Sequence, residues 1–146
     1  MNTSRWSSID AALLVLRVGI GISFVFVYGY EKLFGGMDKW VGLGQNMSAL
    51  GITFWPAFWG FMGAFAEFAG ALLVMFGLLT RPALALLIVT MIVAATSHIV
   101  GLSGGGPWHA TEMLTVFVVL LLTGPGRYSV DAWIEANLFG SGRENA

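Results

Sequence analysis

The sequence predicts an all-α integral membrane protein, in which four helices form a bundle and short helices lie at the membrane interface. Hydrophobic residues make up 57% of the 146 positions and charged residues only 10%, which is outside the range of soluble globular domains. Four apolar segments also approach the ~20 residues that a helix needs to cross the hydrocarbon core. These two observations predict one membrane domain over residues 1–146, without a separate soluble catalytic domain.

The expected helices cover residues 11–34, 57–79, 83–102 and 109–124, and an amphipathic tail follows over 129–139. Positive charge indicates their orientation, because Lys and Arg are retained in cytoplasmic loops. Four arginines belong to the end that holds both termini in this arrangement: Arg5, Arg81, Arg127 and Arg143. Both termini are therefore expected in the cytoplasm, in a multi-pass protein of a bacterial inner membrane.

Two connections between the helices have their own signals. Pro82 suits the first turn of a helix, so residues 80–82 are expected to form a tight hairpin that makes helices two and three antiparallel neighbours. The long connection over 35–56 carries apolar residues at near-helical spacing: Met37, Trp40, Val41, Met47 and Leu50. This spacing predicts a short helix lying in the membrane interface.

Glu67 lies inside an almost wholly apolar segment, where a carboxylate must be paired, protonated or functional. Small residues share its helix face, which indicates that this face packs against protein. They are Gly60, Gly63, Ala64, Gly70 and Ala71. Glu67 is therefore the candidate catalytic residue, near the middle of the membrane. Its partner stays open, because Arg17 could reach upward to it or extend inward past Asp10.

Helix one carries a polar stripe. Asp10, Arg17 and Tyr28 fall within about 20° of each other at 100° per residue, and Glu31 and Lys32 end the same helix. We expect four charged residues of helix one to form a charge network: Asp10, Arg17, Glu31 and Lys32.

His98 and Glu112 reach the same layer from the outer ends of helices three and four, each ~5 Å deep. We expect them to line an outward-opening polar pocket together with Phe24, Tyr28 and Glu67. Such a pocket suits an amphipathic ring with exchangeable protons, such as a quinone head group. The alternative is a hydrogen-bonded network of Glu67, His98 and Glu112 that only fixes the register of the helices.

A metal site is the weaker alternative at this place. His98, His109 and Glu112, together with Glu67, offer enough ligands, but the i, i+3 spacing of His109 and Glu112 alone is weak evidence. His109 is also expected in the glycine-rich loop that precedes the fourth helix, so neither a bound metal nor a haem is expected.

Composition excludes several other classes. The chain has no Cys, which excludes disulfides, iron–sulfur ligation and thiolate chemistry. Any redox role therefore needs a bound cofactor or a partner subunit. The formal net charge of −1 gives no footprint for nucleic acid.

Short motifs follow one another along most of the chain. Leu16, Arg17, Gly21 and Phe24 precede the segments 28–34, 67–70 and 77–81, then His98 and Glu112, and finally the segment 124–131. In their order and spacing these motifs resemble the DoxX family of small four-helix membrane proteins, whose members often carry His where this chain has Tyr28. The resemblance implies a membrane subunit of a thiosulfate to quinone oxidoreductase, or the membrane part of an oxidoreductase complex with soluble partners in redox stress defence. Other similar proteins act as assembly factors or cargo receptors.

Three functions are thus carried forward. The first is a redox-associated subunit that binds a quinone between its helices and works with partner proteins. The second is a non-enzymatic membrane scaffold or assembly factor. The third is a proton or solute pathway, for which four short helices would need to form a homo-oligomer.

Overall fold

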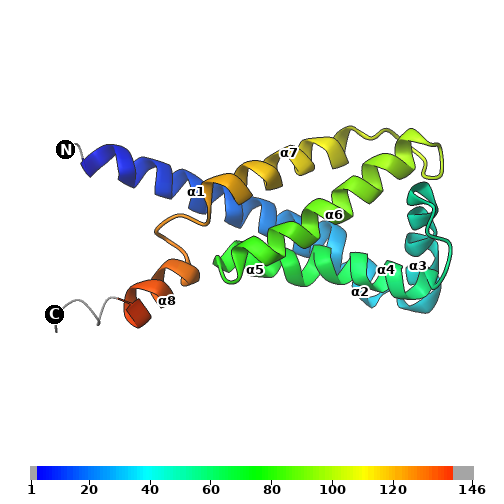
Figure 1. The fold of residues 1–146 in the computed structure, drawn as a ribbon, viewed down its shortest axis with the longest axis horizontal. Helices are drawn as coiled ribbons and strands as arrows, with labels where there is room; N and C mark the ends of the chain where they lie inside the picture. The colour runs from blue at the N-terminus through cyan, green and yellow to red at the C-terminus, as the bar shows by residue number, and fades with distance from the viewer. Residues whose placement is uncertain (1–2, 140–146) are drawn as a thin grey trace.

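The computed structural model describes residues 3–139 of the chain, and every regular element in this range is helical (Figure 1). Three helical segments are long and apolar enough to cross a membrane: Ser8–Phe34, Pro56–Phe76 and Thr80–Ile99. A shorter apolar helix, α7 (Trp108–Thr123), follows them. The prediction of an all-α protein with membrane-spanning helices is confirmed, and the fourth crossing of the membrane stays a prediction.

The first two spans each contain a π-helical segment. Span one consists of α1 (Thr3–Ser23), the π segment η1 (Phe24–Gly29) and α2 (Tyr30–Phe34), so its helix begins well before the expected start at residue 11. The segment η1 packs against η3, a second π segment, which belongs to span two. Gly29 permits this approach, since a Cβ there would lie 2.8 Å from the backbone nitrogen of Phe68. Such π segments are rare and are often found at functional sites.

Span two consists of α4 (Pro56–Phe65), η3 (Ala66–Gly70) and α5 (Ala71–Phe76). A tight turn then leads into α6 (Thr80–Ile99), which returns along η3 and α5. The predicted contact between helices two and three is therefore confirmed. The hairpin itself was expected at residues 80–82, but the turn lies at 77–79 and residues 80–82 already form the first turn of α6, because proline fits there. The turn needs unusual backbone conformations, with φ of 69° at Gly77 and 47° at Leu79. Pro82 lies in the first turn of α6, where its missing N–H costs no hydrogen bond.

The core is formed by buried residues of span one, span two, α6 and α7, and α6 packs against both span two and α7. Its largest apolar members are almost completely buried: Phe24, Leu84, Leu87, Phe117 and Leu120. Phe24 contributes an edge-on ring contact with Phe117, at 5.2 Å between centroids. This contact joins span one to α7.

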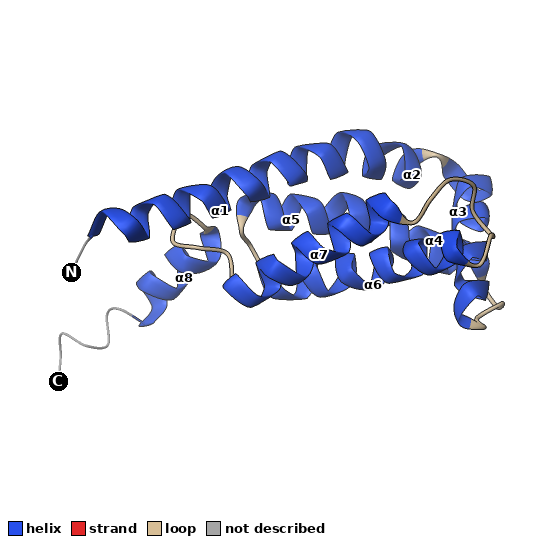
Figure 2. Cartoon of the chain, turned by 90° about the horizontal axis from the view of Figure 1, so that it is seen from above, coloured by secondary structure: helices blue, strands red, loops and turns tan. Residues whose placement is uncertain are grey.

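The helix expected in the connection over 35–56 is present as α3 (Gly36–Gly44), followed by the 3-10 helix η2 (Gln45–Leu50). The pair lies across one end of the bundle (Figure 2), which we call the outer end. It packs closely on α4, because a Cβ at Gly60 would overlap the carbonyl oxygen of Trp40. Only glycine allows the two backbones to meet there.

The opposite end, where α1 begins, carries the tail helix α8 (Val130–Phe139) (Figure 1), and we call it the inner end. Arginine placement predicts that this end faces the cytoplasm. Asp131 joins α8 to the turn before α6: its carboxylate accepts hydrogen bonds from the backbone N–H groups of Leu79 and Thr80 and from the Thr80 hydroxyl. Its own N–H donates to the carbonyl of Gly77 at 2.8 Å. The start of α6 is thus capped by a side chain from the tail.

Candidate functional site

A cavity of about 330 Å³ lies between α4, η3 and α6, below the layer formed by α3 and η2, and it is partly open. Its walls are mostly apolar. Phe58, Trp59 and Met62 come from α4, and Leu86 and Val89 come from α6. Cavities of this size fall at the lower end of the range for small-ligand sites, about 300–1,000 Å³.

The cavity follows from the sequence of the two helices that border it. Gly63 and Ala64 of α4 present almost no side-chain volume, and nothing lies within 4 Å of the position that a Cβ on Gly63 would occupy. On α6 the lining residues recur at helical spacing: Leu86, Val89, Thr90, Val93 and Ala94. One face of α6 therefore meets a face of span two that is too small to fill the space between them.

Glu67 and Lys32 bring charge to the cavity wall. Glu67 lies in the π segment η3 and is 4% exposed, and Lys32 lies in α2. The Lys32 Nζ donates to Glu67 Oε2 at 2.6 Å, and both residues line the cavity. Glu67 is therefore paired, and its partner is Lys32.

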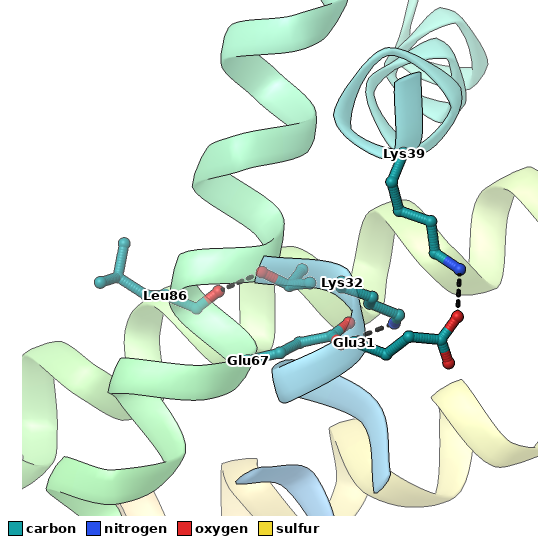
Figure 3. A network of polar contacts seen from close by, with 6 residues as sticks. Glu31, Lys32, Lys39, Glu67 and Leu86 are labelled. Atoms are coloured by element: carbon teal, nitrogen blue, oxygen red, sulfur yellow. Dashed lines mark hydrogen bonds and ion pairs between the residues drawn. The ribbon is translucent and has the colours of Figure 1, made fainter. Parts of the chain in front are cut away.

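A second ion pair lies beside the first and ends in a more exposed position (Figure 3). Lys39 of α3 donates to Glu31 of α2 at 2.6 Å, and the Glu31 side chain is 75% exposed. The indole N–H of Trp40 is shared between the carbonyl oxygens of Lys32 and Leu33, at 3.1 and 3.2 Å. These contacts hold the end of span one under α3 and so fix the backbone of Lys32.

Two further polar side chains border the cavity. Trp59 Nε1 is buried and has no hydrogen-bond partner among the described residues, which leaves a donor for a ligand oxygen. Asn46 accepts a hydrogen bond from Ser103 at 2.9 Å, and the Ser103 hydroxyl lies 3.2 Å from that of Ser97. These hydrogen bonds join η2 to the outer end of α6, and they hold η2 in place over the cavity.

The expected pocket residues divide into two groups. Glu67 lines the cavity, whereas Phe24, Tyr28, His98 and Glu112 do not. Phe24 and Tyr28 turn toward α7, where the Tyr28 ring stacks on the His109 ring at 4.9 Å. His109 is therefore not in the loop as expected but in the first turn of α7, where this ring contact holds it.

His98 is half-buried at the outer end of α6, and its Nδ1 is buried without a partner among the described residues. Glu112 is exposed on α7. Within residues 3–139 no cluster of three or more His, Asp and Glu side chains is arranged to hold a metal ion.

The expected network of Asp10, Arg17, Glu31 and Lys32 is likewise divided. Glu31 and Lys32 belong to the two ion pairs at the outer end. Arg17 extends inward and donates to the carbonyl of Tyr128 at 2.6 Å and to that of Val74 at 3.4 Å. Asp10 accepts from the backbone N–H of Arg127 at 2.9 Å. Of the two arrangements left open for Arg17, the inward one is formed.

Sequence analysis missed the uncharged part of the site. Nothing in the sequence singled out Trp59 or the α6 face that includes Val89 and Thr90 as part of a site. A signal was present in the small residues at positions 63 and 64. They were interpreted as a close helix contact, but at these positions they leave an open space.

Comparison with known proteins adds the family. The DoxX family model matches residues 12–100, a range that contains every residue lining the cavity. The chain is 29% identical over 144 residues to inner membrane protein YphA of Escherichia coli K12, covering 90% of this chain and 99% of YphA. It is 33% identical over 126 residues to inner membrane protein YqjF of the same organism, covering 84% of this chain and 91% of YqjF. No solved structure matches the chain significantly.

Proposed function

The chain belongs to the DoxX family and is a multi-pass inner membrane protein, and from this premise we propose that it is the quinone-binding membrane subunit of an oxidoreductase system. The observation that carries the proposal is the apolar cavity with the Lys32–Glu67 ion pair in its wall. Ionisable groups inside a membrane span are costly, and they commonly mark the site of function. A buried ion pair adds little net stability after desolvation, which favours a role in binding for this one.

A quinone head group matches the chemistry of the cavity. It is a flat and largely apolar ring, and it suits walls formed by Phe58, Met62 and Leu86. Its two oxygens accept hydrogen bonds, and the cavity offers donors in the ammonium group of Lys32 and the unpartnered indole N–H of Trp59. A few polar groups in a mainly apolar cavity are typical of small-molecule sites.

The reaction assigned to the site moves protons as well as electrons. Reduction of a quinone takes two electrons and two protons, and in this proposal the electrons come from a partner oxidoreductase subunit. Glu67 would pass the two protons to the quinone oxygens one after the other, taking up each from the water layer at the outer end, and Lys32 would orient the nearer oxygen and compensate its charge. The exposed Glu31–Lys39 pair beside Lys32 lies between this site and the outer water layer.

Quinone retention tests the proposal. Wild type, Glu67→Gln and Glu112→Gln are purified in lipid nanodiscs, and the quinone retained by each is measured by mass spectrometry. We expect Glu67→Gln to lose roughly ten-fold in retained quinone, because it removes the carboxylate from the cavity wall. Glu112→Gln is the matched control, since Glu112 is exposed on α7; a loss there instead would favour the pocket expected from sequence. A wild-type protein that binds no quinone would refute the proposal and favour the scaffold hypothesis.

A further inference from the structure

We infer that the ligand is a membrane-dissolved quinone with a long apolar tail, and that it enters the cavity sideways from the lipid, between α4 and α6. This inference rests on the proposed function and specifies its substrate. It differs from the outward-opening pocket expected from the sequence, because it places the entrance in the hydrocarbon layer.

The most exposed residues of the cavity lining are apolar, and they mark where the cavity opens. Phe58 of α4 is 49% exposed, and Leu86 and Val89 of α6 are 42% and 58% exposed. All three lie within membrane-spanning segments, so their exposed surface meets lipid. An opening with such a border admits apolar molecules from the bilayer and disfavours ions and sugars from water.

The outer end of the cavity is covered. Leu43, Asn46 and Met47 of α3 and η2 line it from above. The cover is held by the close backbone contact of Gly60 with Trp40 and by the hydrogen bond from Ser103 to Asn46. Entry from the outer water layer would require these contacts to break, whereas entry from the lipid requires none of them to break.

The length of the opening along α6 suits a molecule with a polar head and an apolar tail. The lining of α6 extends from Leu86 to Ala94, which corresponds to ~12 Å along the helix axis. A ring at the Lys32–Glu67 pair would therefore leave its tail at the surface formed by Leu86 and Val89. The tail would remain in lipid, and only the ring would need a site in the protein.

The test narrows the opening with bulky side chains and leaves Lys32 and Glu67 unchanged. Val89→Trp places a large apolar side chain at the border, and Leu86→Trp does so one turn away. Val119→Trp is the matched control, because Val119 is 46% exposed on α7 and does not line the cavity. Each protein is titrated in phosphatidylethanolamine and phosphatidylglycerol nanodiscs with a decyl-substituted dimethoxybenzoquinone and with the same ring lacking the tail. Binding is expressed against the quinone concentration in the membrane.

We expect Val89→Trp and Leu86→Trp to weaken binding of the tailed quinone roughly ten-fold, and Val119→Trp to leave it unchanged. Against the concentration in the membrane, we expect the ring without a tail to bind about as tightly as the tailed quinone, because the tail stays in lipid and contributes only to partitioning. If both border variants bind like wild type while Glu67→Gln does not, lateral entry is overturned and the proposed function stands. If the border variants release a phospholipid but keep the quinone, the opening is a lipid site and the inference is overturned. If wild type binds neither quinone, the proposed function and the inference of lateral entry are both refuted.

Discussion

Two buried charges of the membrane-spanning segments, Arg17 toward the inner end and Glu67 at the cavity, are held in different ways. Arg17 is 0% exposed and donates to two backbone carbonyls, those of Tyr128 and Val74, from separate parts of the chain. Glu67 is 4% exposed, but it is paired with one flexible side chain, Lys32, and an open cavity lies beside it.

This difference between backbone partners and a side-chain partner determines what each charge can do. The backbone carbonyls around Arg17 cannot leave without moving a helix, so Arg17 fastens span one to span two and to the segment before α8. The Lys32 side chain is 27% exposed and can turn toward a ligand or toward water. The charge at the inner end is therefore structural, and the charge at the cavity is free to take part in chemistry.

Replacing each charge by the same neutral amide should separate the two roles most strongly. We expect Arg17→Gln to lower the free energy of unfolding by about 3 kcal/mol, because a buried carbonyl loses its charged donor and a void remains. Glu67→Gln keeps the shape of the side chain and an acceptor for Lys32, so we expect about 1 kcal/mol or less. Thermal unfolding of the detergent-solubilised proteins, followed by tryptophan fluorescence, measures both. Equal losses would contradict the comparison.

Gly77 provides a second way to disturb the inner end. Its φ of 69° disfavours any residue with a Cβ, and a Cβ there would overlap Arg17 Nη1 and lie 2.5 Å from Ser129 Cβ. We expect Gly77→Ala to cost about 2 kcal/mol in unfolding free energy. Gly19→Ala is the control, because Gly19 is helical and nothing lies within 4 Å of its added Cβ. A destabilisation by Gly19→Ala as large as that by Gly77→Ala would show that the inner contact has no special role.

The membrane-spanning helices could be predicted because each is determined by a local apolar segment of the sequence. The length of apolar sequence gave the spans, and Pro82 indicated the turn between the second and third. The π segments could not be predicted, because a π turn depends on packing against a neighbouring helix, as at Gly29 and Phe68. Nor did the apolar pattern show that the first helix extends back to Thr3.

The site was only partly predictable for a related reason. A single carboxylate in an apolar segment is visible in any sequence, so Glu67 was found. Its partner depends on how far span one slides along span two, and this register places Lys32 beside Glu67 and leaves Arg17 at the inner end. The cavity exists because some of the small residues of span two are not packed against another helix. The sequence does not show which ones, since Gly60 and Gly63 have the same side chain. Gly60 is covered by Trp40, whereas Gly63 is open.

Replacing Asp131 is expected to cost less stability than replacing Arg17 or Gly77, and this cost should depend on pH. Burial acts to raise the pKa of Asp131, but hydrogen bonds from Thr80 and Leu79 outweigh burial, and the attraction of Arg17 adds to them. The pKa in the folded protein is therefore below its ordinary value. A depressed carboxyl pKa stabilises the fold above the unfolded-state pKa, about 3.9, and this stabilisation is lost as the pH falls through the folded-state pKa.

We therefore expect Asp131→Asn to lower the unfolding free energy by about 1 kcal/mol at neutral pH, because the start of α6 loses a charged cap. The difference from wild type should shrink as the pH falls below about 4, since the wild-type carboxylate then takes up a proton. Unfolding temperatures of both proteins across this pH range test the expectation. Glu135→Gln is the control, because Glu135 is exposed on the same tail helix and should show neither effect. A difference that stays constant with pH would mean that the shape of Asp131, and not its charge, holds the tail to the bundle.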